Sequence, residues 1–184
     1  MASRSYPPLE VEITRANWLL RALWETVWLI FYRPSPTPFF AWRRMLLRLF
    51  GATIGHKARP YHTVKIWAPW NLRMEAHSCL SPYVICYSVA QVTLGKHANV
   101  SQYSYLCTAS HDYRKLSMPT IAAPITIEDE GWVAADVFVG PGVTVGQGAV
   151  VGARSTVTGD VAPWVVVAGS PVRQLGTRPR FERN

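Results

Sequence analysis

The sequence predicts an all-β core, a parallel β-helix of short repeated strands, with α-helices in front of it. Three observations support this prediction. Beyond residue 53, aliphatic residues recur every six positions, and the residue four positions later is small or Val with one exception. Before residue 51, apolar residues recur instead at helical spacing. A fixed repeat of this kind indicates coils that stack on one another around one core.

Two N-terminal helices are predicted. Residues 17–32 contain neither Gly nor Pro and are followed by a proline cluster, which ends a helix. A second helix over residues 39–50 combines Arg43, Arg44 and Arg48 with apolar residues at helical spacing. Such a basic amphipathic helix could lie on an anionic membrane, or both helices could pack on the rest of the protein or on a neighbouring subunit. The sequence leaves both readings open.

Fifteen six-residue repeats can be aligned, and thirteen of their first positions are Ile, Leu, Val or Met. About four would be expected if such residues make up roughly a quarter of a chain. The fifth positions are small or Val except Trp70. An inward aliphatic side chain and a small residue near each corner suit a triangular prism. The first positions are Ile54, Pro60, Ile66, Met74, Leu80, Cys86, Leu94, Val100, Leu106, Ile127, Val133, Val139, Val145, Val151 and Val157.

Three repeats make a coil, and the coil starts at residues 54, 74, 94, 127 and 145 predict five stacked coils. Two spacings are widened by two residues, near Arg73 and Val92, which we interpret as corner bulges. The third is widened by fifteen, residues 112–126, and is expected to leave the prism as a loop. Long loops in compact domains are commonly functional. Glycines at second positions, such as Gly95, are expected to suit the turns.

The charge pattern divides the chain into three parts: a helical segment (residues 1–53), one β-helix domain (54–168) and a basic C-terminal tail (169–184). Of the formal net charge of +8, the first part carries +4 and the last +3. A nucleic-acid reader should show a continuous basic face or a known motif, and the sequence shows neither. We therefore expect no nucleic-acid partner.

The cysteines and histidines predict neither a disulfide framework nor a metal site. Cys79, Cys86 and Cys107 are odd in number and lack the spacing of metal ligands, which favours a reducing cytoplasm. The N-terminus lacks the pattern of a signal sequence, so we expect a cytoplasmic protein, if anything at the inner face of the membrane. Four histidines are expected on different faces as solvent-facing turn residues, with no metal required: His56, His62, His77 and His97.

Four segments point to a family: RPSPTP (33–38), VKIWAPWNL (64–72), LCTASHDYR (106–114) and FVGPGVTVGQGAVVGARSTVTGDVAPWVVVAGSPVR (138–173). Through them nearly the whole chain resembles the hexapeptide-repeat sugar O-acetyltransferases, specifically the colanic acid biosynthesis acetyltransferases. The resemblance implies a left-handed β-helix and acetyl-CoA as co-substrate. It also implies a sugar or lipid-linked oligosaccharide acceptor, expected to be a polysaccharide precursor, and a homotrimer with its sites between subunits.

His111 is the candidate catalytic residue. It ends the third coil at a corner, immediately before the long loop. Acyl transfer to a hydroxyl needs a base, and imidazole titrates near the working pH. The catalytic His of the family matches this position. Asp112 could orient the imidazole as part of the substrate site, or could cap the loop.

The residues expected to contact the acceptor lie before the catalytic His in the sequence. Many relatives carry an Asn one coil before the catalytic His, and this chain has Tyr83, Cys86, Tyr87 and Ser88 in that region instead. Of these, Tyr83, Tyr87 and Ser88 are the candidates for substrate binding.

The coenzyme is expected along the later coils, where small residues allow its pantetheine arm to approach the backbone. Ala134, Ala135, Gly152 and Ala153 are the candidates. The resemblance adds four more: Trp132 flanking the arm, Thr158 near it, and Arg173 and Arg178 toward the phosphates, which arginine binds well.

Two other functions remain open. A non-catalytic β-helix could dock glycosyltransferases at the membrane through residues 17–50. A zinc-dependent carbonic anhydrase shares this fold but requires three converging His ligands. The expected scatter of the histidines argues against this function.

Overall fold

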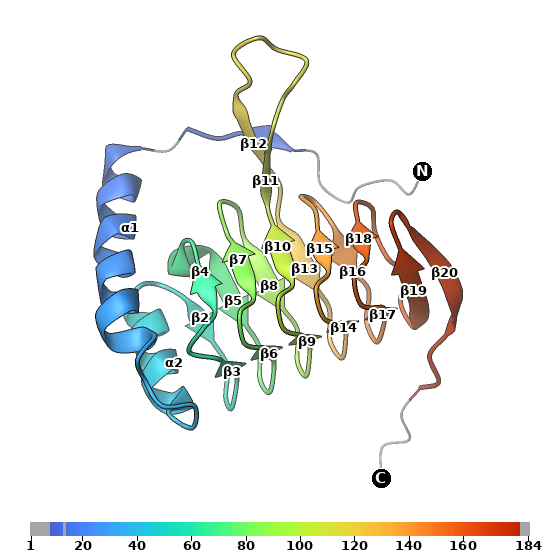
Figure 1. The fold of residues 1–184 in the computed structure, drawn as a ribbon, viewed down its shortest axis with the longest axis horizontal. Coiled ribbons are helices and arrows are strands. Elements are labelled where there is room, and N and C mark those ends of the chain that lie inside the picture. Colours follow the sequence, from blue (N-terminus) through green and yellow to red (C-terminus); the bar gives the residue numbers. More distant parts are fainter. Residues whose placement is uncertain (1–7, 13, 181–184) are drawn as a thin grey trace.

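The core of the protein is a triangular prism of stacked coils, with two helices at one end (Figure 1). The structure, a computed structural model, describes residues 8–12 and 14–180. Each coil contributes one short strand to each of three parallel sheets. The first corner joins the first sheet to the second, the second corner joins the second to the third, and the third corner returns to the first.

The strands are two or three residues long, apart from the last two. The first sheet contains β2 (Thr53–Ile54), β5 (Leu72–Met74), β8 (Val92–Leu94), β13 (Ile125–Ile127) and β16 (Thr144–Val145). The second contains β3 (Arg59–Pro60), β6 (Cys79–Leu80), β9 (Asn99–Val100), β14 (Trp132–Val133), β17 (Val150–Val151), β19 (Val165–Gly169) and β20 (Val172–Thr177). The third contains β4 (Lys65–Ile66), β7 (Ile85–Tyr87), β10 (Tyr105–Cys107), β15 (Phe138–Val139) and β18 (Thr156–Val157).

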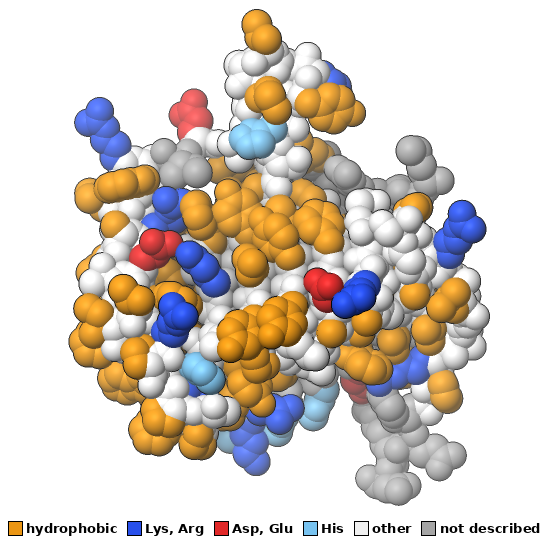
Figure 2. All heavy atoms as spheres, viewed as in Figure 1, with side chains coloured by type: hydrophobic (Ala, Val, Ile, Leu, Met, Phe, Trp, Pro, Cys, Tyr) orange, Lys and Arg blue, Asp and Glu red, His pale blue; other side chains and the backbone are white. Residues whose placement is uncertain are grey.

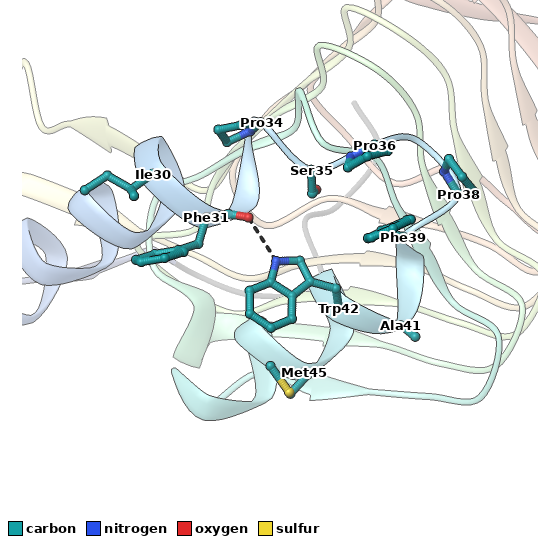
Figure 3. A pocket seen from close by; sticks show the side chains of 10 residues that line it. All are labelled: Ile30, Phe31, Pro34, Ser35, Pro36, Pro38, Phe39, Ala41, Trp42 and Met45. Atoms are coloured by element: carbon teal, nitrogen blue, oxygen red, sulfur yellow. Dashed lines mark hydrogen bonds between the residues drawn. The ribbon is translucent and has the colours of Figure 1, made fainter.

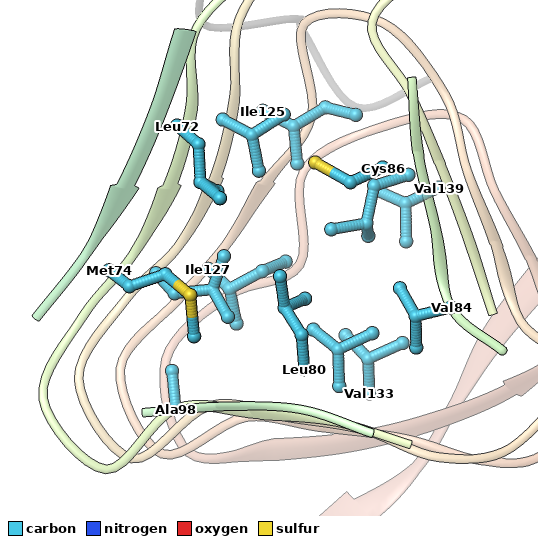
Figure 4. Close-up of a cluster of buried hydrophobic side chains, with 14 of the residues drawn as sticks. Leu72, Met74, Leu80, Val84, Cys86, Ala98, Ile125, Ile127, Val133 and Val139 are labelled. Carbon is cyan, nitrogen blue, oxygen red and sulfur yellow. The ribbon is translucent and has the colours of Figure 1, made fainter. Parts of the chain in front are cut away.

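The strand registers stack equivalent repeat positions on one another. Ile54 pairs with Met74, and Met74 pairs with Leu94. All fifteen first positions of the repeat are buried. Their side chains fill the inside of the prism together with residues such as Leu72 and Ile125 (Figure 4). Each fully buried aliphatic side chain stabilises the fold by about 1.5–3 kcal/mol, so the repeat itself builds the core.

The third corner of the first three coils departs from the repeat. The predicted small inward position falls on Trp70, Ala90 and Ser110, none of which is buried. The chain instead buries the third residue of the repeat, namely Ala68, Ser88 and Thr108. These coils carry extra residues at this corner, and a 3₁₀ turn at Pro69–Asn71 takes up those of the first coil. The widenings therefore lie a few residues earlier than the sequence pattern indicated.

Two helical segments cover the open end of the first coil. Helix α1 (Arg15–Val27) starts at a Thr14 cap and continues as a π-helical turn, Trp28–Tyr32, and α2 (Phe40–Leu49) follows the proline cluster. Their side chains donate to carbonyl oxygens along the edge of the first coil, where no further coil pairs with the backbone. The donor and acceptor pairs are Trp24–Ile66, Trp28–Val64, Tyr32–Tyr61, Arg43–Pro60, Arg44–Ala58 and Arg48–Ile54.

This arrangement corrects the expected orientation of the second helix. On a membrane-bound helix Arg43, Arg44 and Arg48 would point toward the lipid phosphates, but all three donate to the prism. The carbonyl oxygens at the edge of the first coil accept hydrogen bonds from these guanidinium groups. The basic side of the helix therefore faces the prism, and Met45 and Leu49 point outward. Both helices pack on the rest of the protein. In the part of the chain that the structure describes, no helix is long and apolar enough to cross a bilayer.

The long excursion is a β-hairpin rather than an open loop. β11 (Ala109–His111) pairs antiparallel with β12 (Thr120–Ala122), and β1 (Leu9–Glu10) pairs with the other edge of β12. The chain is back in the prism at β13, so the predicted loop over residues 112–126 overlaps two strands. In the same way, part of the predicted tail is ordered, because β20 pairs antiparallel with β19.

Gly95 illustrates why glycines follow the first positions. A Cβ at this residue would lie 2.5 Å from the backbone nitrogen of Asp129 in the next coil. The glycine is therefore needed for the close approach of stacked coils and not for a turn conformation. The left-handed turn positions are occupied by other residues, such as His97 and Tyr103, with φ of 58° and 62°.

Candidate active site

His111 stands at the base of the projecting hairpin, as the last residue of β11. Its ring is exposed, and its Nδ1 lies 2.8 Å from the carbonyl oxygen of Met118. Because a carbonyl only accepts hydrogen bonds, Nδ1 carries the proton in this contact, and Nε2 is the unprotonated nitrogen of the neutral ring. This is the tautomer that a general base requires.

Asp112 caps the hairpin turn. Its carboxylate accepts hydrogen bonds from Arg114 Nε at 2.7 Å, Arg114 Nη2 at 3.1 Å and the Arg114 backbone nitrogen at 3.2 Å. These bonds lower the pKa of Asp112 below its usual value. Lys115 and Glu10 form a further ion pair between the hairpin and β1. Of the two roles that the sequence left open for Asp112, the structure favours the cap.

Tyr87 belongs to a row of aromatic side chains on the outer face of the third sheet. Its ring meets Trp67 edge to face at 4.8 Å and Tyr105 at 6.4 Å, and Tyr105 meets Phe138 at 5.7 Å. Figure 2 shows this hydrophobic surface below the projecting hairpin. Tyr87 pairs in register with Cys107, four residues before His111, so it lies on the side of the prism from which the hairpin leaves.

Ser88 and Tyr83 lie elsewhere. Ser88 is fully buried, and its hydroxyl bonds to both the backbone nitrogen and the carbonyl oxygen of Ala68. Its side chain is part of the wall and has no open face toward an acceptor. Tyr83 lies at the second corner, where its ring stacks on Tyr103 at 5.2 Å and 3°. Of the three predicted acceptor residues, only Tyr87 is on the His111 side.

An open groove follows the second corner in the later coils. It encloses about 410 Å³ and is lined by Tyr103, Ala135, Asp136, Ala153 and Arg154. Its two alanines bring the backbone close to the surface, and Arg154 forms an ion pair with Asp136 at 3.6 Å. Such a groove suits an extended, amide-containing chain, as the pantetheine arm of coenzyme A is.

Only some of the residues predicted to bind the coenzyme lie at the corner that carries the groove. Ala134 and Gly152 belong to the same corner as the groove, but a Cβ on Gly152 would meet Ala168 at 2.8 Å, so this glycine also serves coil packing. Trp132 lies on the outer face of the second sheet and donates to Ser101 Oγ at 3.0 Å. Thr158 is exposed at the third corner.

The two tail arginines predicted to contact the coenzyme phosphates have different surroundings. Arg173 is exposed on β20. Arg178 donates to the carbonyl oxygens of Glu130 at 3.0 Å and Gly148 at 3.2 Å, which ties the tail to the first corner. Arg178 therefore has a structural role that the sequence did not reveal.

Three histidines gather at the first corner and are not scattered as the sequence analysis expected. The ring of His77 stacks on His97 at 4.8 Å and meets His56 edge to face at 6.0 Å. Burial, followed by the neighbouring His97, lowers the pKa of His77. Stacked rings do not converge on an ion, and the described residues contain no group of three potential metal ligands. A twenty-residue coil places His77 and His97 at the same corner position, and His56 lies one position off this spacing, 21 residues before His77.

Two contributors to the site were missed. Met118 orients His111 through its carbonyl oxygen, and a backbone contact leaves no signal in a single sequence. Tyr103 lines the groove and could have been found, because it repeats Tyr83 one coil later.

Comparisons with known proteins agree with this fold. No family model matches the chain. The protein assigned as colanic acid biosynthesis acetyltransferase WcaF in Escherichia coli (strain K12) is 43% identical over 160 residues, which are 87% of this chain and 88% of that protein. A hexapeptide-repeat acetyltransferase of Vibrio cholerae, solved with acetyl-CoA, has a TM-score of 0.80 at 30% identity over 91% of both chains. A maltose O-acetyltransferase of Clostridium difficile 630 has a TM-score of 0.84 at 19% identity over 96% of this chain and 95% of that one, which shows the fold alone. The predicted left-handed β-helix with N-terminal helices is confirmed.

Proposed function

The chain belongs to the hexapeptide-repeat sugar O-acetyltransferases, in the group of the colanic acid biosynthesis acetyltransferases, and from this premise we propose that His111 is its general base and a polysaccharide precursor its acceptor. The chain is an acetyl-CoA-dependent acetyltransferase. The observation that carries the assignment of the base is the hydrogen bond between His111 Nδ1 and the Met118 carbonyl, which leaves Nε2 free to accept a proton.

The reaction requires one proton to be moved twice. When bound, acetyl-CoA supplies the thioester carbonyl that a sugar hydroxyl attacks. Nε2 of His111 removes the proton from that hydroxyl as its oxygen bonds to the carbonyl carbon. The carbon–sulfur bond breaks, and the imidazolium returns the proton to the departing sulfur, giving the acetyl ester and a free thiol. Met118 stabilises the imidazolium because its carbonyl oxygen faces Nδ1–H throughout.

The site is proposed to lie between subunits of a homotrimer. His111 leaves the prism at the third corner, whereas the groove with Ala135 and Ala153 follows the second corner. Acyl transfer needs the two within contact distance, and a neighbouring prism can supply the groove that faces each His111. A closed threefold assembly repeats this contact three times.

Mixing two inactive variants tests the shared site. His111→Ala removes the base, and Ala153→Trp fills the groove at an exposed position. In trimers of both chains at equal amounts, about a quarter of the interfaces pair an intact base with an intact groove. Co-expression should therefore restore about a quarter of wild-type turnover, while each variant alone stays inactive. If mixed trimers, verified by mass spectrometry, remain inactive, base and groove belong to one chain.

Arg173 and Arg178 provide a matched pair for the phosphate contact. We expect Arg173→Ala to raise the Michaelis constant for acetyl-CoA but not for acetyl-pantetheine, which lacks the phosphates. Arg178→Ala should lower the melting temperature, because two carbonyl oxygens lose their donor. Steady-state kinetics with both donors and thermal unfolding separate the roles. Equal effects of Arg173→Ala on the two donors would contradict the phosphate contact.

The alternative function, a scaffold that docks glycosyltransferases, predicts no turnover of acetyl-CoA. Family membership and the free Nε2 of His111 favour the enzyme.

A further inference from the structure

The side of the helices that faces away from the prism is unusually apolar. We refer to it as the outer helix face, and it is formed by ten exposed apolar residues. Isolated apolar residues are normal on a protein surface, but a contiguous set of this size marks an interaction site. The ten residues are Trp18, Leu19, Leu23, Leu29, Ile30, Phe31, Phe39, Trp42, Met45 and Leu49.

A preformed groove lies within this face, between the end of α1 and the start of α2 (Figure 3). It encloses about 850 Å³, and its lining includes Phe31, Pro36 and Trp42. The Trp42 Nε1 donates to the Phe31 carbonyl oxygen at 2.9 Å, which closes one side of the groove. Beneath it, the buried Arg43 donates to the carbonyl oxygen of Pro36 at 2.9 Å. The polar groups of this loop are thus satisfied internally, and apolar side chains remain outside.

The charges around the outer helix face are mostly positive, although the exposed Glu12 lies three residues before Arg15. Arg15 and Arg33 are exposed at the two ends of the first helical segment. Glu25 is the one carboxylate in the sequence of residues 14–50, and it lies 3.9 Å from Lys65, which offsets its charge. The surface is therefore apolar with a basic margin. A second copy of the same face would bring like charges together, whereas an anionic surface complements them.

We propose that the outer helix face docks on an anionic lipid bilayer. The aliphatic side chains enter the boundary between headgroups and acyl chains, and the exposed tryptophans lie at the headgroup level, where amphipathic rings are favoured. Arg15 and Arg33 contact lipid phosphates. The contact is peripheral, like that of an amphipathic helix lying in the interface, and combines apolar burial with electrostatic attraction. The prism then stands with its first coil toward the membrane.

Vesicle sedimentation with the full chain tests this proposal. We expect the protein to sediment with vesicles of phosphatidylcholine and phosphatidylglycerol, and to do so much less with phosphatidylcholine alone. Binding should fall at about 1 M salt, where charges are screened beyond roughly 3 Å. A Leu29→Glu/Phe31→Glu variant should bind at least about tenfold more weakly, because two exposed side chains of the face become charged.

Leu175→Glu is the matched control, because Leu175 is an exposed apolar residue on β20, at the far end of the prism. It should bind as the wild type does, and sedimentation velocity should show one oligomeric state for all three proteins. Failure of the wild type to bind anionic vesicles would overturn the proposal, as would equal weakening by Leu175→Glu. A change of oligomeric state in the Leu29→Glu/Phe31→Glu variant, without vesicle binding by the wild type, would assign the face to a protein contact instead. None of these readouts depends on acetyl transfer.

Discussion

Replacing Arg43 with Met should lower the stability of the protein more than replacing either of the other two arginines of α2. The Arg43 side chain is fully buried and donates to the Pro60 carbonyl at 2.8 Å, to Ser35 Oγ at 2.9 Å and to the carbonyls of Pro36 and Thr37. Burial lowers the pKa of the Arg43 guanidinium because it removes the charged group from water. The four hydrogen-bond acceptors offset this cost of desolvation. Methionine would fill the space and leave the acceptors without a donor.

The expected loss is about 3–5 kcal/mol, because each unsatisfied buried acceptor costs about 1–3 kcal/mol and some will reach water. For a chain of this size that corresponds to a fall in melting temperature of about 6–20 °C. Thermal unfolding followed by circular dichroism measures it. Arg44→Met is the control: this half-buried side chain donates only to the Ala58 carbonyl among the contacts described, and its loss should cost about 1 kcal/mol. Equal melting temperatures for wild type and Arg43→Met would mean that Arg43 does not hold the helices on the first coil.

The parts of the fold that the sequence predicted are those in which one residue type repeats for one physical reason. Val100 and Val133 stack in register because each coil must place an aliphatic side chain inside the prism. The helices were predicted by composition and by the proline cluster. Their orientation was not, because helical periodicity cannot tell whether Arg48 reaches solvent or a carbonyl at the edge of the prism.

The candidate site shows the same limit. His111 could be singled out because the repeat places it at a corner next to an insertion. Its tautomer depends on the carbonyl of Met118, seven residues away across a hairpin, and no side-chain pattern encodes that contact. Ser88 was a candidate for acceptor binding, but its side chain is buried, because the extra residues at the third corner shift which position faces inward.

Replacing His111 with Ala should reduce turnover by about a hundred to ten thousand fold, the usual contribution of a general base. The ring is exposed, so its removal opens no cavity, and the fold and the affinity for acetyl-CoA should be kept. His97→Ala, which removes an exposed imidazole at another corner, is the control and should keep wild-type activity.

The most direct measurement follows isotopically labelled acetyl from acetyl-CoA into a surface-glycan precursor, with the wild type and His111→Ala side by side. For the wild type we predict one acetyl ester on a sugar oxygen for each coenzyme thiol released, and no label on the protein, because His111 acts as a base and not as a nucleophile. His111→Ala should transfer label at no more than about a hundredth of that rate. Unlabelled glycan with the wild type, or more than about a third of normal transfer by His111→Ala, would contradict the assignment of His111 as the base for sugar acetylation.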